Sequence, residues 1–231
     1  MAGKRFKDLL CAYCSARSSC TEDHVFARAF FLEKHRANLP KAPACRECNT
    51  EKSALEHYLA TVLPFGGRHF DAHETLIEKV PQRLNRNQRL HREIREGTTE
   101  IELIEGSTSS LALAVPVIGE AIEKAFVFIV KGLAWHHWRI YLDGRVRVVA
   151  QSLTADGCVF FEENFFSRRP AKRVAVDLGE GTFVYEGVQA VDVPTVTAWR
   201  FRAYGGALFV GDDDLASNEI GVVSGPRDNA R

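Results

Sequence analysis

Four cysteines near the start of the chain have the spacing of metal ligands. They form two Cys-x-x-Cys pairs, Cys11 with Cys14 and Cys45 with Cys48. Each pair lets two sulfurs reach one ion from a tight turn, and two pairs complete a tetrahedral zinc site with Zn–S distances of about 2.3 Å. The spacing therefore predicts a Zn²⁺ held by these four cysteines. We expect its role to be structural, because four thiolates leave the metal no open position.

The segment between the two pairs is unusually long. It spans 30 residues, more than the spacer of a simple zinc ribbon. Reduced thiols or a redox pair are the alternative, but two such pairs in one short stretch favour a metal site. We interpret the remaining Cys20 and Cys158 as ordinary thiols, and Cys20 is also a candidate for a substitute ligand.

Inside and just after this spacer lie residue types suited to phosphodiester hydrolysis. Histidine titrates near neutral pH and suits a general base that activates water, a role open to His24. Carboxylate and amide oxygens suit a hard ion such as Mg²⁺, and Asp23 and Asn49 supply one of each. Such an ion neutralises charge on the phosphate and on the leaving oxygen. Together these residues predict a hydrolytic metal site.

A non-catalytic interpretation exists for each of these residues. Asn49 has the residue type that caps a helix, and Asp23 and His24 suit a polar surface. On a regular strand, adjacent side chains point to opposite faces. A shared site for Asp23 and His24 therefore requires a bend in the backbone.

In this stretch the sequence resembles the HNH endonucleases in their zinc-stabilised ββα-metal form. The resemblance covers residues 8–62. The matching strings are Cys11-Ala-Tyr-Cys14, Glu22-Asp23-His24-Val-Phe-Ala-Arg and Cys45-Arg-Glu-Cys48-Asn49-Thr-Glu-Lys52-Ser53. One departure is that many members have Glu-His-Val-Ile-Pro where this chain has Asp23-His24-Val25-Phe26-Ala27.

The resemblance implies a metal-dependent DNA endonuclease, a hydrolase of phosphodiester bonds. It assigns His24 as the general base, Asp23 and Asn49 as catalytic residues that hold Mg²⁺ or Mn²⁺, and the four cysteines as structural zinc ligands. The late helical histidine of the family pattern has no certain match, and His57 is kept as a reserve ligand behind Asn49. The alternative function is a non-catalytic zinc module that binds nucleic acid or a protein. RNA as the substrate also stays open.

The elements around the motif predict an α+β fold with three regions: the zinc-bound ββα-metal module at 8–62, a basic helical connection at 63–110, and a helix followed by a β-rich region at 111–231. Apolar spacing predicts one helix that starts at Asn49 and is ended by Pro64, and another over 116–138. Asp143-Gly144 predicts a hairpin turn. Short strands are expected at Val159–Phe161, Arg173–Asp177, Thr182–Tyr185, Thr195–Tyr204 and Ala207–Val210.

The N-terminal part has the charge that suits nucleic acid. Residues 1–95 carry 17 Lys and Arg against 11 Asp and Glu, whereas residues 96–231 carry 13 against 19. A row of arginines at every third position, Arg83 to Arg95, suits phosphate contacts along one side of a helix, although a solvated helix face is the alternative. The candidate nucleic-acid contacts, most naturally to double-stranded DNA, are Arg28, Lys52, Arg83, Arg86 and Arg89.

Composition limits the broad class. Hydrophobic residues make up 45% of the chain, enough for a folded core. No apolar run is long enough for a transmembrane helix, and the basic N-terminus lacks the apolar segment of a signal peptide. We therefore expect a cytoplasmic protein that makes no membrane contact. Its oligomeric state is open, with a dimer as one option.

Overall fold

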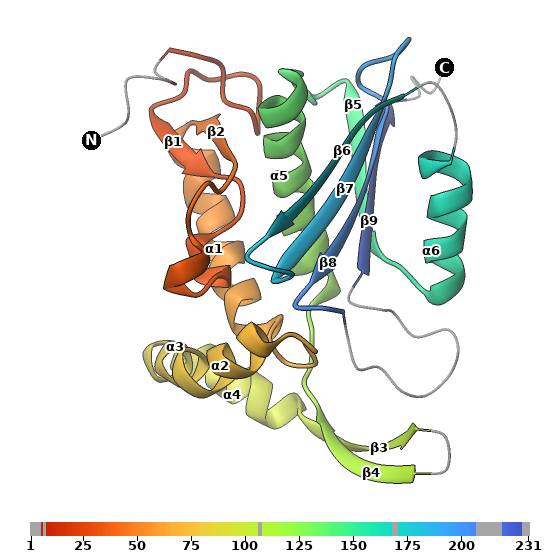
Figure 1. Ribbon diagram of the computed structural model, residues 1–231. Helices are drawn as coiled ribbons and strands as arrows, with labels where there is room; N and C mark the ends of the chain where they lie inside the picture. Colours follow the sequence, from red (N-terminus) through yellow and green to blue (C-terminus); the bar gives the residue numbers. More distant parts are fainter. Residues whose placement is uncertain (1–5, 7, 106–107, 168–170, 207–218, 228–231) are drawn as a thin grey trace.

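The centre of the fold is a five-stranded antiparallel sheet with the order β5-β9-β8-β7-β6 (Figure 1). The computed structural model describes residues 6, 8–105, 108–167, 171–206 and 219–227. The mixture of helices and antiparallel strands confirms the α+β class. The strands are β5 (Val146–Ser152), β6 (Ala171–Leu178), β7 (Phe183–Ala190), β8 (Thr197–Ala203) and β9 (Glu219–Pro226).

The two faces of the sheet are covered differently. Trp199 and Phe201 of β8 belong to the main core, together with Phe126 of the long helix α5 (Gly119–Trp138). The preceding residue, Ala198, faces the other side, where it clusters with Phe161 of α6 (Ala155–Phe161) and with η4 (Glu162–Phe166). This alternation follows from the two-residue period of a strand. Figure 1 accordingly shows α5 and α6 on opposite sides of the sheet.

The N-terminal part packs against α5 and one end of the sheet. It contains an antiparallel pair, β1 (Thr21–His24) with β2 (Lys41–Ala44), two 3-10 turns, η2 (Arg28–Phe30) and η3 (Glu33–His35), and helix α1 (Arg46–Val62). The ring of Phe26 stacks on Tyr185 at a centroid distance of 5.5 Å. Residues from all three predicted regions belong to one hydrophobic core. The predicted boundaries at 62 and 110 therefore do not separate this core into parts.

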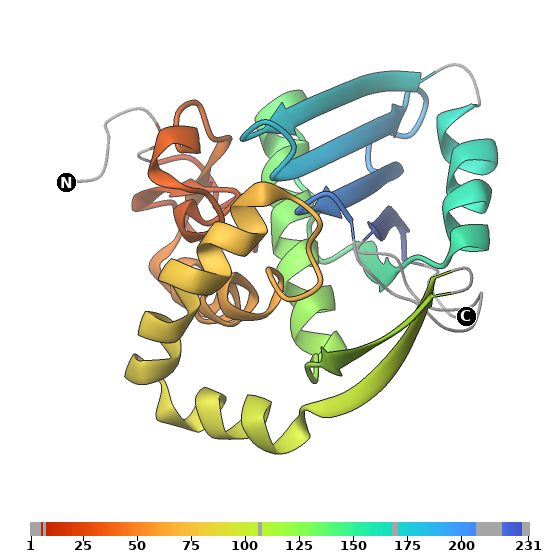
Figure 2. The ribbon, with the colours of Figure 1, turned by 60° about the horizontal axis from the view of Figure 1, so that its bottom comes forward.

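Three helices and a hairpin follow α1 as an arm. They are α2 (Phe70–Glu78), α3 (Val80–Arg86), α4 (Gln88–Gly97), β3 (Thr99–Glu105) and β4 (Thr108–Ala114). Figure 2 shows the helices leading into the hairpin, which projects from the body. Asn87 leaves helical geometry between α3 and α4 (φ −120°, ψ 78°). The arginine row is thus divided between two helices, which corrects the expectation of one continuous helical side.

Several element predictions are confirmed and two are wrong. Helices α1 and α5 and strands β6, β7 and β8 lie where periodicity placed them. The expected strand at Val159–Phe161 is wrong, since these residues end α6. The hairpin across Asp143-Gly144 is also wrong: β5 pairs with β9, far along the chain. The segment Ala207–Val210 lies outside the described residues. Within the described chain, no helix combines the length and apolar character needed to cross a membrane.

Candidate metal centre and the His24 pocket

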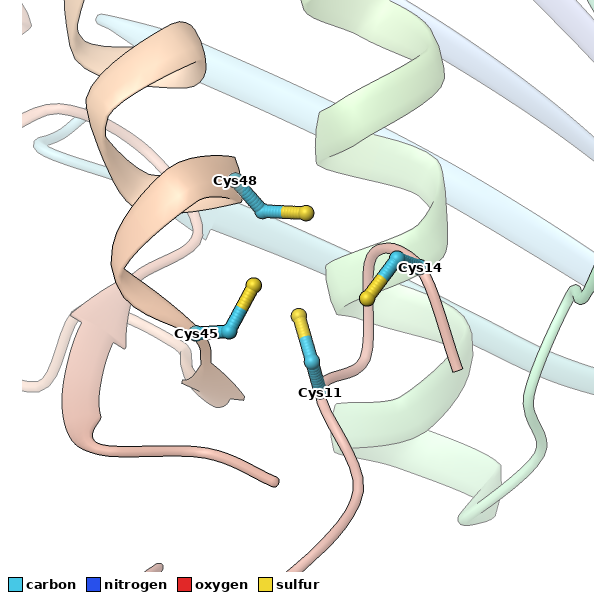
Figure 3. A group of neighbouring side chains, drawn as sticks. All are labelled: Cys11, Cys14, Cys45 and Cys48. Carbon is cyan, nitrogen blue, oxygen red and sulfur yellow. The ribbon is translucent and has the colours of Figure 1, made fainter. Parts of the chain in front are cut away.

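The four cysteines converge from two segments. Cys11 and Cys14 come from the N-terminal loop, whereas Cys45 caps the start of α1 and Cys48 lies in its first turn. Their four sulfurs lie within 4.8 Å of one another, and Figure 3 shows them directed toward a common centre. A tetrahedral zinc with Zn–S bonds of about 2.3 Å places its sulfurs about 3.8 Å apart. The arrangement is therefore close to a closed four-thiolate site, and the cluster suits a metal such as zinc.

The surroundings of the cluster favour the thiolate of Cys14, whereas burial raises the pKa of Cys11 and of Cys48. Burial of Cys14 opposes its ionisation, but hydrogen bonds from the backbone N–H groups of Ala16 and Arg17 outweigh it and lower the pKa to about 7. Lys131 of α5 lies close enough to the thiolates for their charge to raise its pKa, although its own burial lowers the pKa overall. Its Nζ donates to the Tyr13 carbonyl at 3.0 Å. A cation is thus fixed beside the first cysteine pair.

The donor set passes a simple test of fit for structural zinc. All four ligands are thiols, all are free of disulfides, and three of the four are buried. Such a site has no open position for a substrate or water. The suggested substitute, Cys20, is exposed and lies outside the cluster, so the two pairs complete the site by themselves.

Asp23 faces α1 and is already partnered there. Its Oδ2 is 3.0 Å from Lys52 Nζ and also accepts a hydrogen bond from the Tyr13 hydroxyl. Lys52 pairs in addition with Glu56, and it donates to the His24 carbonyl at 2.8 Å. The Lys52 side chain is only 1% exposed. This burial corrects the expectation that Lys52 contacts nucleic acid, because its ammonium group is enclosed by protein oxygens.

Asn49 lies inside α1 and is not its cap. Its backbone N–H donates to the Cys45 carbonyl at 3.0 Å, and Cys45 occupies the N-cap position. Among the described residues, no hydrogen bond joins the Asn49 side chain to Asp23 or His24. The reserve ligand His57 is exposed farther along the same helix. Within the same described set, only the cysteines form a group of three or more potential metal-ligating His, Cys, Asp or Glu side chains.

The residues expected to hold Mg²⁺ or Mn²⁺ do not form an assembled site as they are placed. The carboxylate of Asp23 is engaged by an ammonium group, and one carboxylate oxygen cannot serve a cation and Lys52 without a rearrangement. Burial raises the pKa of Glu56 to about 7, against the opposing effect of Lys52. This second carboxylate is therefore only about half ionised at neutral pH. The donor set thus fits an ammonium ion pair better than a hydrated divalent ion.

His24 faces the opposite side of β1, where it lines a pocket of about 410 Å³. We call this the His24 pocket. Burial, followed by the charge of Lys41, lowers the pKa of His24. The imidazole is therefore neutral at neutral pH, which is the form that accepts a proton. The charged and histidine side chains that line the pocket are Glu22, His24, Arg36, Lys41, His136 and Arg139.

Two residues of the pocket come from the end of α5. His136 Nδ1 lies 3.0 Å from the Lys41 carbonyl, which brings α5 against β2. Arg139, the next residue after α5, also lines the pocket. Trp135, at the same end of α5, is buried in the core. No local spacing could reveal His136 or Arg139, because their partners lie about a hundred positions earlier.

The other predicted nucleic-acid contacts differ in their surroundings. Arg28, Arg86 and Arg89 are exposed, and Arg89 pairs with Glu93 at 2.8 Å. Arg83 is half-buried and donates to the carbonyls of Ala60 and Ala29, the latter at 2.8 Å. Its guanidinium thus joins α3 to the N-terminal part, so Arg83 has a structural role.

Comparisons with protein-family models, with curated proteins and with solved structures found no match to this chain.

Proposed function

We propose that this protein is an endonuclease that hydrolyses phosphodiester bonds in DNA, with His24 as the general base. One observation carries the proposal: a four-cysteine cluster anchors the two segments that flank β1 and β2, and this strand pair presents a neutral, half-buried His24 to a pocket with cationic walls. A neutral imidazole suits proton abstraction from water. The HNH-like sequence of residues 8–62 supports the same function.

Each part of this arrangement has a distinct role in the proposal. Zinc on Cys11, Cys14, Cys45 and Cys48 holds the start of α1 against the N-terminal loop and supplies no reactive ligand position. His24 takes the proton of the attacking water. The pocket contains Arg36, Lys41 and Arg139 against one carboxylate, Glu22. Such an excess of positive charge favours a phosphodiester and the additional negative charge of its transition state.

A catalytic Mg²⁺ or Mn²⁺ at Asp23 and Asn49 remains part of the proposal as a requirement to be tested. Asp23 is paired with Lys52, so we derive no step through a metal ion at this position. The same ion pair favours a second candidate function, a zinc module that binds nucleic acid without cleaving it. The two candidates differ in whether His24 is needed for a chemical step.

Cleavage of supercoiled plasmid DNA, with and without Mg²⁺ or Mn²⁺, separates these functions. We expect the wild type to nick the plasmid and His24→Ala to lose about a hundredfold or more of the rate, the usual contribution of a general base. His73→Ala, at an exposed histidine of α2, is the matched control and should cleave normally. Equal rates for wild type and His24→Ala would remove His24 from the mechanism. Binding of DNA without cleavage in any metal would favour the second candidate.

A further inference from the structure

We propose that the His24 pocket is the subsite for a nucleic-acid phosphodiester, and that Arg139, after the last turn of α5, positions this group. The proposal rests on the proposed function, because it gives the substrate of the same site. It also extends the site beyond the zinc-anchored segment, since Arg139 and His136 belong to the part of the chain that sequence analysis left without a role.

The charge of the pocket favours an anion. Its charged lining consists of Arg36, Lys41 and Arg139 together with one carboxylate, Glu22. Glu22 pairs with Lys41, which leaves the two guanidinium groups as the excess positive charge. Guanidinium groups match the geometry of phosphate oxygens and bind them with paired hydrogen bonds. The pocket therefore has the chemistry of a phosphate site.

Arg36 is held in place before any ligand arrives. Its Nε donates to the carbonyls of Arg28 and Phe31 at 3.0 and 3.1 Å. Its Nη1 lies 3.8 Å from the carboxylate of Glu33, which is exposed, so water weakens that ion pair. The anchored Nε leaves the terminal nitrogens for an anion at a low entropic cost.

Arg139 is held in place on the other side. Its guanidinium lies over the Trp135 ring, 4.2 Å from the centroid, and its Nη1 donates to the Trp135 carbonyl at 3.1 Å. Its backbone is left-handed (φ 57°, ψ 32°), a conformation that favours glycine at the end of a helix. An arginine at this position accepts some backbone strain and carries a charged group to the pocket.

The size of the pocket and its histidines agree with this ligand. A volume of about 410 Å³ lies within the range of roughly 300–1,000 Å³ that is usual for small-ligand sites. A phosphodiester between the two arginines would share the pocket with the His24 imidazole. His136 contacts the Lys41 backbone and so links α5 to the strand that pairs with β1. The end of α5 thereby sets the distance between Arg139 and His24.

DNA binding without cleavage tests the proposal directly. Fluorescence anisotropy of a short labelled DNA duplex, in buffer without added Mg²⁺ or Mn²⁺, would compare wild type with Arg139→Gln. We expect the variant to bind about tenfold more weakly or worse, and the slope of log K against log salt to fall by about one unit. Arg139→Lys keeps the charge but loses the paired geometry, so we expect intermediate affinity. Arg147→Gln, at an exposed arginine of β5 outside the pocket lining, should bind as the wild type does.

The outcomes distinguish this proposal from the proposed function. Weakened binding by Arg139→Gln, with normal zinc content and melting temperature, supports the subsite even when no preparation cleaves DNA. Wild-type affinity and salt slope in Arg139→Gln would overturn it, even when the wild type is an active nuclease. An equal loss in Arg139→Gln and Arg147→Gln would also overturn it, because binding would then depend on overall charge and not on the pocket.

Discussion

Asp23 and His24 are neighbours in β1, yet their side chains lie in different environments. Asp23 Oδ2 is 3.0 Å from Lys52 Nζ on the α1 side, whereas His24 lines the pocket that the end of α5 completes. The strand remains regular through this pair, since Asp23 pairs with Ala42 and His24 with Lys41. A regular strand sends adjacent side chains to opposite faces. The proposed base and the predicted metal ligand are thus separated by the backbone of β1.

The buried position of Lys52 predicts a large loss of stability when its charge is removed. Lys52→Met leaves Asp23 and Glu56 facing each other with no cation, so we expect the free energy of unfolding to fall by about 3–5 kcal/mol. Chemical denaturation measures this change. Lys172→Met, at an exposed lysine of β6, should shift stability by less than about 0.5 kcal/mol.

The same variant tests the proposed metal ligand. In Lys52→Met, a divalent ion that binds Asp23 would replace the missing positive charge, so Mn²⁺ should raise the melting temperature more than it does in the wild type. An additional Asp23→Asn substitution should abolish this response. A Mn²⁺ response that is equal in all three proteins would argue against a cation site at Asp23.

Replacement of one zinc ligand should cost metal and folding together. Cys45 lies at the junction of β2 and α1, so Cys45→Ser removes a ligand and loosens the start of the helix. We expect zinc content, measured by atomic absorption, to fall well below one ion per chain and the cooperative unfolding transition to weaken. Cys20→Ser is the control, because Cys20 is exposed and outside the cluster. A Cys45→Ser protein that is folded and fully loaded with zinc would contradict the four-thiolate site.

Local sequence signals were enough for the elements that depend on local periodicity. The apolar spacing of α1 and α5 and the alternation in β8 are properties of short windows. The run at Val159–Phe161 resembles a strand in composition, but Thr154 caps a helix there by accepting a hydrogen bond from the Gly157 N–H. The turn signal at Asp143-Gly144 does form a turn, but the partner of β5 is β9, and no local rule supplies that long-range pairing.

The candidate site likewise has a part that local spacing predicts and a part that depends on long-range packing. The spacing of the cysteines alone was enough to predict their cluster, because two short turns bring four sulfurs together. The partners of Asp23 depend on how α1 packs, so a string that matches a metal site also suits an ion pair with Lys52. The pocket residues His136 and Arg139 depend on the docking of α5 against β2. Such docking depends on how the whole core packs. It therefore produces no spacing pattern by which these residues could be recognised in the sequence.

The close approach of α5 to the cysteine segment predicts that substitution of Gly132 lowers stability. A Cβ on Gly132 would lie 2.9 Å from Val25 Cγ2 and 3.3 Å from Tyr13 Cε1. Val25 is fully buried, so it has little space to move. We expect Gly132→Ala to reduce the free energy of unfolding by about 1–2 kcal/mol, even though alanine favours helix. Gly119→Ala in the same helix meets nothing within 4 Å and should be neutral or stabilising. Equal stability in both variants would show that α5 packs less closely than described.

A half-buried histidine, His137, predicts a loss of stability in acid. His137 Nε2 lies 2.9 Å from the Tyr185 hydroxyl, and burial, with the charges of His136 and Arg139, lowers its pKa from 6.5 to about 4. Below pH 6.5 the His137 imidazole binds a proton in the unfolded chain, whereas in the folded chain it stays neutral until the pH approaches 4. The contribution of His137 to stability is therefore complete above pH 6.5 and is lost as the pH falls toward 4, and it stays below about 3 kcal/mol because solvent screens the partly exposed imidazole. Denaturant titrations across this range measure the decline.

The contribution of His137 is isolated by a difference between two proteins. Glu56 acts in the opposite sense, because its raised pKa of about 7 makes the folded state bind the extra proton and gain stability as the pH falls through that value. His137→Gln keeps a polar side chain beside Tyr185 but cannot titrate, so the stability difference between wild type and variant should shrink as the pH falls from 6.5 to 4. His73→Gln, at an exposed histidine of α2, should follow the wild type at every pH. A difference between wild type and His137→Gln that is independent of pH would mean that His137 keeps an ordinary pKa in the folded protein.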